Sequence, residues 1–136
     1  MMAGYLDSDR IDTSPVVDGW FNTGDLAHVA EDGTIALRGR ESETINVAGM
    51  KVVPSEVEEI ISAVPGVREA KVYAGRLRSG DQFIKAAIVS SGSPDLAEFR
   101  KHCEQHLIYY KRPSRFLFVD SLPKTASGKI ILDRLP

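Results

Sequence analysis

The chain has 136 residues, which is the length of one domain and too short for two full-sized ones. With 17 Lys plus Arg against 19 Asp plus Glu, its net charge is −2, so it offers no broad basic surface for nucleic acid or anionic lipid. No apolar run reaches the length of a membrane span. The single cysteine, Cys103, cannot form an internal disulfide, and the N-terminus lacks the pattern of a signal peptide. We therefore expect a cytoplasmic protein that has no nucleic-acid partner and no membrane span.

Residues 1–38 indicate turns and short strands and give no helix signal. Asp32-Gly33 lies between the runs LAHVA and TIALR, and this combination predicts a β-hairpin. The segment is poor in large apolar residues for its length. We therefore expect it to lie against another body rather than to form a core of its own.

The next stretch predicts a two-stranded ribbon followed by a helix. Short β-branched runs flank Gly49, which suits a tight turn. The helix is introduced by Pro54 and Ser55, and Ser55 and Glu58 have the spacing of a capping box. Pro65-Gly66 is expected to end it.

The remaining elements complete the order β-β-α-β-β-α-β. The runs 67–75 and 82–90 predict two strands, and 116–119 predicts a third, buried strand. Ser93-Pro94 is expected to begin a second helix with proline in the first helical position. The sequence thus predicts an α+β fold, in which a small β-ribbon and a three-stranded sheet are covered by two helices. The apolar stripe of the second helix comprises Leu96, Phe99, Cys103 and Leu107.

A glycine-lysine pair, Gly128-Lys129, lies near the C-terminus in the predicted loop PKTASGK. It is not a P-loop, because Pro123 and Ile130 stand where that motif needs Gly and Ser or Thr. Lys129 is then either a solvated tail residue or a point charge that reaches a phosphate or a developing oxyanion.

Two histidines, His102 and His106, are four residues apart on the second predicted helix and could form one face of a metal site. A third ligand at suitable spacing is missing. We therefore expect a solvated helix face and predict no bound metal.

Two further polar residues have two interpretations each. Asp25 follows Thr23-Gly24, and a carboxylate on such a turn either accepts hydrogen bonds from ribose hydroxyls or closes a surface turn. Arg40 either binds a phosphate or ribose or forms a surface ion pair.

Taken together, these segments resemble the C-terminal part of the adenylate-forming superfamily. That superfamily includes acyl-coenzyme A (CoA) synthetases, the adenylation domains of nonribosomal peptide synthetases and the luciferases. The chain is most similar to acyl-CoA synthetases, which include the fatty-acid–CoA ligases. The matching segments occur in the family's order and comprise GYL and DGWFNTGDLA between Gly4 and Ala27, GRESETINVAGMKVVPSEVEEII from Gly39, and YKRP with FVDSLPKTASGKI, ending at Ile130.

The resemblance implies a role for each ambiguous residue. Asp25 corresponds to the family's ribose-binding aspartate, and Arg40 to an arginine that also contacts the nucleotide. Ala48 and Gly49 correspond to the loop that lines the pantetheine channel during thioester formation. Lys129 corresponds to the catalytic lysine that reaches the carboxylate and the α-phosphate during adenylation.

The resemblance also implies a domain division. Residues 1–40 would be the last strip of an N-terminal AMP-binding domain, and residues 41–136 the C-terminal lid domain. The hinge would span 40–43 and include Glu41 and Ser42. At the position of Ser42 the family usually has Asp or Lys.

The implied reaction converts ATP, a carboxylic acid and CoA to acyl-CoA, AMP and diphosphate, as in fatty acid metabolism. ATP or AMP and CoA would be substrates, and Mg²⁺ would come with ATP without being bound by this domain. The N-terminal AMP-binding domain of the same enzyme would be the partner, and this chain alone would be inactive. Two alternatives are a peptide-synthetase adenylation subdomain, with a carrier-protein thiol as acceptor, and a noncatalytic stand-alone binding module.

Overall fold

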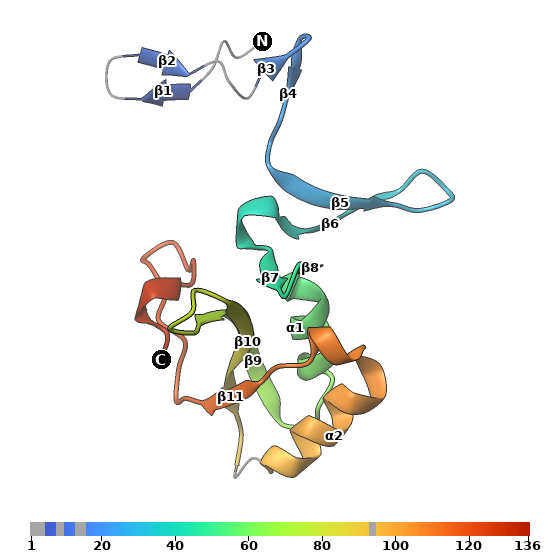
Figure 1. Ribbon diagram of the computed structural model, residues 1–136, viewed down its shortest axis with the longest axis vertical. Coiled ribbons are helices and arrows are strands. Elements are labelled where there is room, and N and C mark those ends of the chain that lie inside the picture. Colours follow the sequence, from blue (N-terminus) through green and yellow to red (C-terminus); the bar gives the residue numbers. More distant parts are fainter. Residues whose placement is uncertain (1–4, 8–9, 13–15, 93–94) are drawn as a thin grey trace. The chain divides into compact units, whose positions relative to one another are not determined.

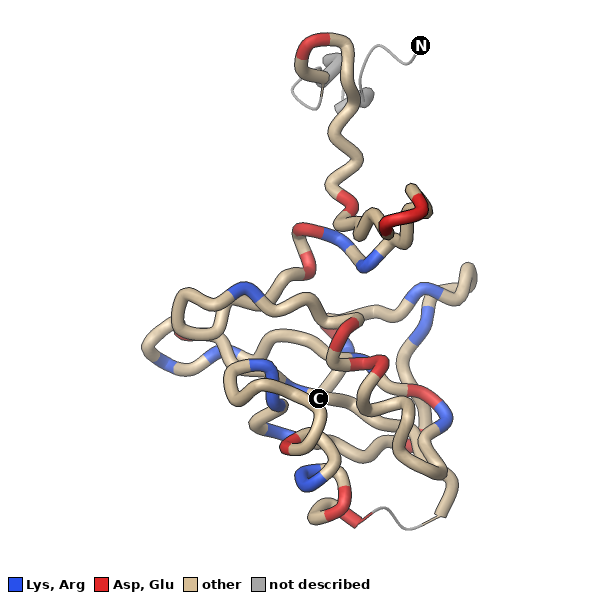
Figure 2. The backbone as a smooth tube through the Cα atoms, turned by 90° about the vertical axis from the view of Figure 1, so that its right-hand side faces the viewer, with Lys and Arg blue, Asp and Glu red and all other residues tan. Residues whose placement is uncertain are grey.

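A computed structural model describes residues 5–7, 10–12, 16–92 and 95–136, with side chains from residue 16 onward. Gly4, where the family resemblance begins, lies outside these residues. Two compact units make up the chain, Met1–Ser42 and Glu43–Pro136. Figure 2 shows Lys and Arg interspersed with Asp and Glu along the described chain.

The first unit consists of short antiparallel strand pairs in its described part (Figure 1). The pairs are β1 (Tyr5–Asp7) with β2 (Arg10–Asp12), β3 (Val16–Val17) with β4 (Trp20–Phe21), and β5 (Asp25–Val29) with β6 (Ile35–Arg40). The absence of helix signals in this stretch agrees with this all-strand structure.

The β5–β6 hairpin confirms the turn expected at Asp32-Gly33. Gly33 has a φ of 83° and donates its amide hydrogen to the carbonyl of Ala30. The Asp32 carboxylate accepts a hydrogen bond of 2.9 Å from the Thr34 amide. Hydrogen bonds to Thr34 lower the pKa of the Asp32 carboxyl group below its ordinary value.

Several large apolar side chains in the described part of the first unit are exposed. All buried residues in the described part of the chain belong to Glu43–Pro136 instead. The exposed large apolar side chains of this unit are Val17, Trp20, Val29, Ile35 and Leu37. Apolar side chains that gather on a surface are typical of sites that meet another protein body.

The second unit is built on a three-stranded sheet in the order β11-β10-β9. β9 (Val67–Arg76) and β10 (Gln82–Ser90) are antiparallel, and β11 (Arg115–Phe118) is parallel to β10. The predicted sheet is confirmed. Its third strand differs from the expectation, because it begins one residue earlier and is a half-buried edge strand rather than a fully buried one.

The predicted ribbon and the first helix both form. The ribbon pairs β7 (Ile45–Val47) with β8 (Met50–Val52). Helix α1 spans Pro54–Ser62, and Val53 is its N-cap without a side-chain cap hydrogen bond. The capping-box prediction for Ser55 and Glu58 is therefore wrong, because Pro54, with its fixed φ and no amide hydrogen, already occupies the first helical position.

The second helix, α2 (Leu96–His106), begins later than predicted. Asp95 is its N-cap, and its carboxylate accepts a hydrogen bond of 2.8 Å from the Ala97 amide. Ser93-Pro94, the predicted start, lies outside the described residues. The expected apolar stripe is buried except at its first position, where Leu96 is 40% exposed. The buried members are Phe99, Cys103 and Leu107.

The two faces of the sheet bury different partners, because successive side chains on a strand point to opposite faces. On one face, Val72, Ala86 and Ile88 share a core with the two helices and the ribbon. On the other face, Ala87 and other β9 and β10 residues pack with the C-terminal segment. In Figure 1 the helices and that segment lie on opposite sides of the sheet. The second core comprises Tyr73, Ala87, Val89 and Leu122, with Leu117, Val119, Ile130 and Leu135 packed against it.

Candidate functional site

Asp25 and Arg40, predicted separately as nucleotide ligands, meet across the β5–β6 hairpin. They are paired in the strand register, and Asp25 Oδ1 lies 2.8 Å from Arg40 Nε. The turn before Asp25 is held locally, since the Gly24 amide donates to Asn22 Oδ1 and the Asp25 amide donates to Thr23 Oγ1. The Asp25 side chain remains 29% exposed. The pair therefore presents a carboxylate and a guanidinium together at the surface of the first unit.

The predicted hinge residues, Glu41 and Ser42, belong to a short 3₁₀ turn, η1 (Glu41–Glu43). The Glu41 amide donates a hydrogen bond of 2.8 Å to the carbonyl of Gly24. The boundary between the two compact units falls directly after Ser42.

Directly after that boundary, Glu43 is held by a charge cluster that sequence reasoning missed. Lys71 on β9 is only 15% exposed, and its Nζ lies 3.3 Å from Glu43 Oε2 and 3.1 Å from Glu58 Oε1. Glu58 Oε1 also accepts a hydrogen bond of 2.9 Å from the Val72 amide. Burial lowers the pKa of Lys71, but the attraction and hydrogen bonds of Glu58, and then of Glu43, outweigh it and the pKa is raised.

The predicted pantetheine loop is the turn between β7 and β8. Ala48 has a φ of 50° and Gly49 a φ of 87°, which is the left-handed pair that a type I′ hairpin turn requires. The Asn46 side chain braces this turn, because its Oδ1 accepts a hydrogen bond of 2.8 Å from the Gly49 amide. A Cβ added at Gly49 would meet no atom within 4 Å, so the approach to this turn is open.

A groove of about 370 Å³ lies beside the ribbon. Ala48 and Met50 line one part of it, and Tyr109 and Tyr110, from the short turn η2 (Tyr109–Lys111), line another. Tyr109 is 70% exposed. The tyrosine pair directly ahead of the Lys111-Arg112-Pro113 segment was the sequence signal for this groove, and sequence reasoning overlooked it.

Lys129 lies on a hydrogen-bonded hairpin, which the expected loop PKTASGK turns out to form. Lys124 and Ile130 form an antiparallel bridge, and the Thr125 amide donates to the carbonyl of Lys129. Thr125 Oγ1 in turn accepts a hydrogen bond of 3.0 Å from the Lys129 amide. Buried Leu122 and half-buried Ile130 anchor the two ends of this hairpin to the sheet.

The two lysines of this hairpin have different surroundings. Lys124 Nζ forms an ion pair of 2.5 Å with Glu69 Oε2 on β9. Lys129 is exposed, and its ammonium group has no ion-pair partner among the residues that the structure describes. Lys124 thus ties the hairpin to the sheet, whereas the Lys129 ammonium remains available to a ligand.

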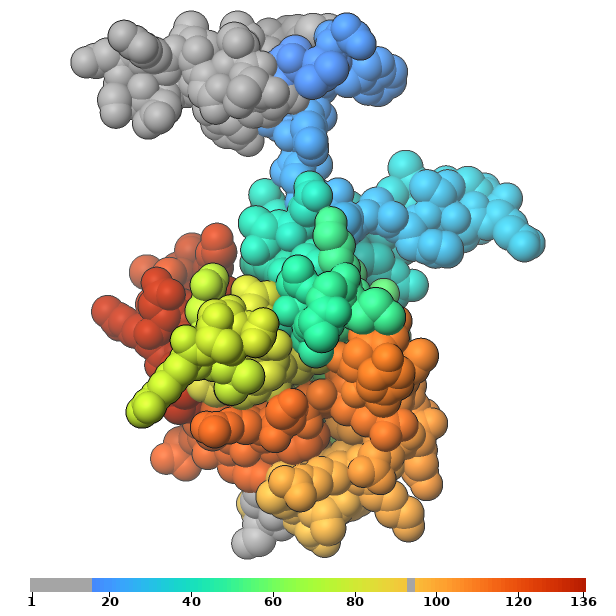
Figure 3. Space-filling view, viewed as in Figure 1, coloured from blue at the N-terminus to red at the C-terminus, as the bar shows by residue number. Residues whose placement is uncertain are grey.

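The turn at Gly49 and the hairpin of Lys129 are not neighbours within the second unit. In Figure 1 and Figure 3 the β7–β8 ribbon and the 124–130 hairpin lie on opposite sides of the turn between β9 and β10.

The histidine pair matches the expected solvated face only at His106, which is exposed. His102 is half-buried and its Nε2 donates to the carbonyl of Ile60 on α1 at 3.0 Å. The His106 ring stacks on it with ring centroids 4.3 Å apart. Between them, Cys103 is buried, and burial raises the pKa of its thiol to about 11. Among the described side chains, no group of three His, Cys, Asp or Glu residues is placed to bind a metal ion.

Comparison with known proteins identifies the family. Residues 56–129 match the family described as AMP-binding enzyme C-terminal domain. A 2-succinylbenzoate–CoA ligase of Listeria monocytogenes is 38% identical over 132 residues, which cover 97% of this chain and 28% of that protein. The fatty acid–[acyl-carrier-protein] ligase ScoC of Streptomyces coeruleorubidus is 36% identical over 118 residues, or 85% of this chain and 23% of that protein.

Comparison with solved structures leads to the same group of enzymes. The o-succinylbenzoate CoA synthetase of Bacillus subtilis, in complex with its acyl-adenylate intermediate, has a TM-score of 0.84 and 27% identity. The match covers 96% of this chain and 27% of that one. This chain belongs to the AMP-binding enzyme C-terminal domain family of adenylate-forming enzymes, which confirms the resemblance and the α+β fold class. It spans about a quarter of the length of these relatives. None of its helices, within the described residues, is long and apolar enough to cross a membrane.

Proposed function

We propose that this chain serves as the C-terminal domain of an acyl-CoA synthetase that converts ATP, a carboxylic acid and CoA to acyl-CoA, AMP and diphosphate. The observation that carries the proposal is the exposed ammonium of Lys129, which has no ion-pair partner among the described residues and lies on a hairpin anchored by Lys124 and Glu69. The relatives that act on CoA or on carrier-protein thiols support the reaction class.

Lys129 would serve the first step, adenylation. The carboxylate attacks the α-phosphorus of ATP and diphosphate leaves, so negative charge builds up on the oxygens of the transferring group. A lysine ammonium group stabilises that charge most when the main chain that carries the lysine is already ordered, because the protein then needs little reorganisation in the transition state. The hydrogen bonds between Thr125 and Lys129 supply this order. Mg²⁺ would enter with ATP as part of the substrate.

The Ala48-Gly49 turn would serve the second step. A thiol attacks the acyl carbon of the adenylate and AMP leaves, so the thiol arm must reach the site through a channel. The open space at Gly49 and the adjoining groove suit an extended arm such as pantetheine. A carrier-protein thiol is the second candidate acceptor, because the relatives include fatty acid–[acyl-carrier-protein] ligases.

The two steps would be separated by rotation of the lid domain, residues 41–136. The hinge at 40–43 would permit this rotation, and the boundary between compact units after Ser42 supports it. The separation of the β7–β8 ribbon from the 124–130 hairpin supports it as well, because different orientations of the lid would bring the Gly49 turn and Lys129 to the substrate (Figure 3).

The partner would be an AMP-binding domain that precedes residues 41–136, with residues 1–40 as its last strip. The exposed Trp20, Ile35 and Leu37 support such a partner surface. Asp25 and Arg40 would contact the nucleotide there. The isolated chain is expected to form no thioester.

We also propose a cytoplasmic location for this protein. Its single cysteine, Cys103, is buried as a free thiol, which is typical of a reducing compartment.

The test separates the two half-reactions in the full-length enzyme that contains this chain. Lys129→Ala should lower adenylation by about 100-fold or more, the loss typical of one preorganised electrostatic contact. Formation of thioester from supplied acyl-adenylate should persist. Exchange of labelled pyrophosphate into ATP measures the first step, and consumption of synthetic adenylate measures the second.

The matched controls are a second lysine and a second glycine. Lys124→Ala removes the ion pair with Glu69 and should leave both steps within a few-fold of wild type. Gly49→Leu should impair thioester formation and spare adenylation. Gly92→Leu changes another left-handed glycine (φ 90°) with open space around it and should spare both. Equal losses in both steps for Lys129→Ala and Gly49→Leu would contradict the proposal.

A further inference from the structure

The first residue of β10, Gln82, reaches across to the β7–β8 ribbon. Its Oε1 accepts a hydrogen bond of 2.7 Å from the main-chain amide of Asn46, which is 36 residues away in sequence. Because a main-chain amide is only a donor, Gln82 must present its oxygen there. This contact joins the main sheet to the ribbon that carries the Ala48-Gly49 turn.

Asn46 passes the connection on to the turn itself, because its side-chain Oδ1 accepts from the Gly49 amide at 2.8 Å. The turn needs such support, since Ala48 has a φ of 50°, a left-handed conformation that residues with a Cβ rarely adopt. Gln82 therefore braces the main chain of Asn46, and Asn46 braces the strained turn two residues later.

We propose that Gln82 is a positioning residue, which holds the Ala48-Gly49 turn in the shape that admits the acceptor thiol. This inference rests on the proposed function of that turn. Gln82 itself contacts the ribbon and acts on the thiol channel only through Asn46. The expected consequence is a selective effect on the second half-reaction.

The surroundings of Gln82 make this role separable from general stability. The pocket that it lines, of about 290 Å³, is open and polar, with Gly80 and Asp81 opposite the Gly49 turn. Gln82 is half-buried, so water can replace its hydrogen bond without unfolding the sheet. Removing the acceptor should loosen the turn and leave the core intact.

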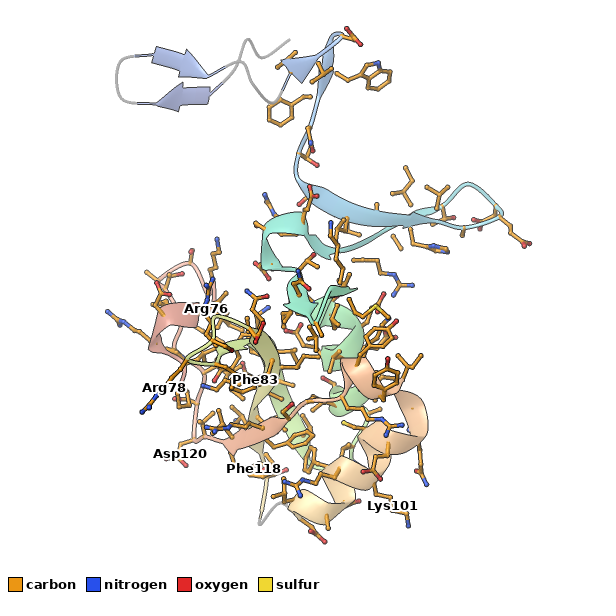
Figure 4. All side chains as sticks on the ribbon, viewed as in Figure 1. Arg76, Arg78, Phe83, Lys101, Phe118 and Asp120 are labelled. Carbon is orange, nitrogen blue, oxygen red and sulfur yellow. The ribbon has the colours of Figure 1, made fainter. Side chains whose placement is uncertain are left out.

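Because Gln82 is the acceptor of this hydrogen bond, the test variants either remove or keep an acceptor oxygen at position 82. Gln82→Met keeps length and volume but loses the acceptor. Gln82→Glu keeps an oxygen acceptor, and its added charge lies opposite Arg76 in the β9–β10 register. Arg76 is labelled in Figure 4. The matched control is Gln105→Met, which alters an exposed glutamine on α2.

The first measurement is amide hydrogen exchange in the 136-residue chain, followed by NMR. In Gln82→Met, exchange at the Asn46 amide should be about tenfold faster, the scale of one lost hydrogen bond, and exchange at the Gly49 amide should also accelerate. Gln82→Glu and Gln105→Met should match wild type at both. Unchanged exchange at Ile88 in the core verifies the fold. Unchanged exchange at Gly49 in Gln82→Met would overturn the proposal.

The second measurement is thioester formation from supplied acyl-adenylate in the full-length enzyme. Gln82→Met should slow it about tenfold and leave pyrophosphate exchange unchanged, whereas Gln82→Glu should restore it. Equal loss in the Met and Glu variants, or equal loss in both half-reactions, would overturn the positioning role. A wild-type enzyme that forms no thioester would refute the proposed function instead. Hydrogen exchange at the Gly49 amide would still test whether Gln82 supports the turn.

Discussion

Asp25 and Arg40 are joined by an ion pair of 2.8 Å between strands β5 and β6. The pairing orients the Asp25 carboxylate, and the main chain of Asp25 is held by its turn, because its amide donates to Thr23 Oγ1. A carboxylate oriented in this way can accept two hydrogen bonds from the vicinal hydroxyls of a ribose. The two interpretations of Arg40, surface ion pair and nucleotide contact, therefore do not exclude each other.

Asp25→Asn should raise the KM for ATP in pyrophosphate exchange by about tenfold or more, because hydrogen bonds to a charged acceptor are lost or weakened. The full-length enzyme is the protein to assay. Asp32→Asn is the control, since the asparagine oxygen can still accept from the Thr34 amide in the hairpin turn. A KM that rises equally in both variants would show that Asp25 has no specific nucleotide role.

Alanine substitutions at Ile61 and Ile108 should show how much more a buried isoleucine contributes to the unfolding free energy than an exposed one. Ile61 on α1 is fully buried, so Ile61→Ala should lower the unfolding free energy of the 136-residue chain by about 2–5 kcal/mol. Ile108 is 53% exposed, and Ile108→Ala should change that free energy by less than about 0.5 kcal/mol. Urea denaturation measures both. Similar losses would mean that the core does not lie between the helices and the sheet.

Deprotonation of Lys71 at alkaline pH should lower the unfolding free energy of the chain. Its pKa in the folded chain is raised above the ordinary value of 10.5. The folded state therefore holds this proton more tightly than the unfolded state does. The stabilisation is complete below pH 10.5 and is lost as the pH rises through the folded pKa. The unfolding free energy of wild type should fall in that range.

The comparison variant for this prediction is Lys71→Met, which leaves Glu43 and Glu58 without their cation. The unfolding free energy of Lys71→Met should be lower than that of wild type at pH 7. The difference between the two free energies should become smaller above pH 10.5. Burial also raises the pKa of Tyr73, which adds an alkaline loss of the same sign to both proteins, so only their difference reports on Lys71. A difference that stays constant from pH 8 to pH 12 would refute the prediction.

Several elements could be predicted from local sequence because their signals are local. Asp32-Gly33 supplies the left-handed glycine of its hairpin, and Gly49 does the same for the ribbon. The helices followed from apolar spacing. The first begins at Pro54 as predicted but lacks the expected capping box, and the second begins at Leu96 rather than at Ser93-Pro94. Those errors arose where two capping signals compete within a few residues, and only one can occupy the helix start.

The sequence by itself determined the order of elements, the motifs that define the family and the position of Lys129, for which we propose a role in adenylation. The tertiary structure decided which side chains meet over long separations in the chain. Gln82 braces Asn46, Lys71 holds Glu43, and Lys124 pairs with Glu69. None of these pairs has a periodic or local signature, because each depends on how the sheet brings distant backbone segments within the few ångströms over which hydrogen bonds and ion pairs act.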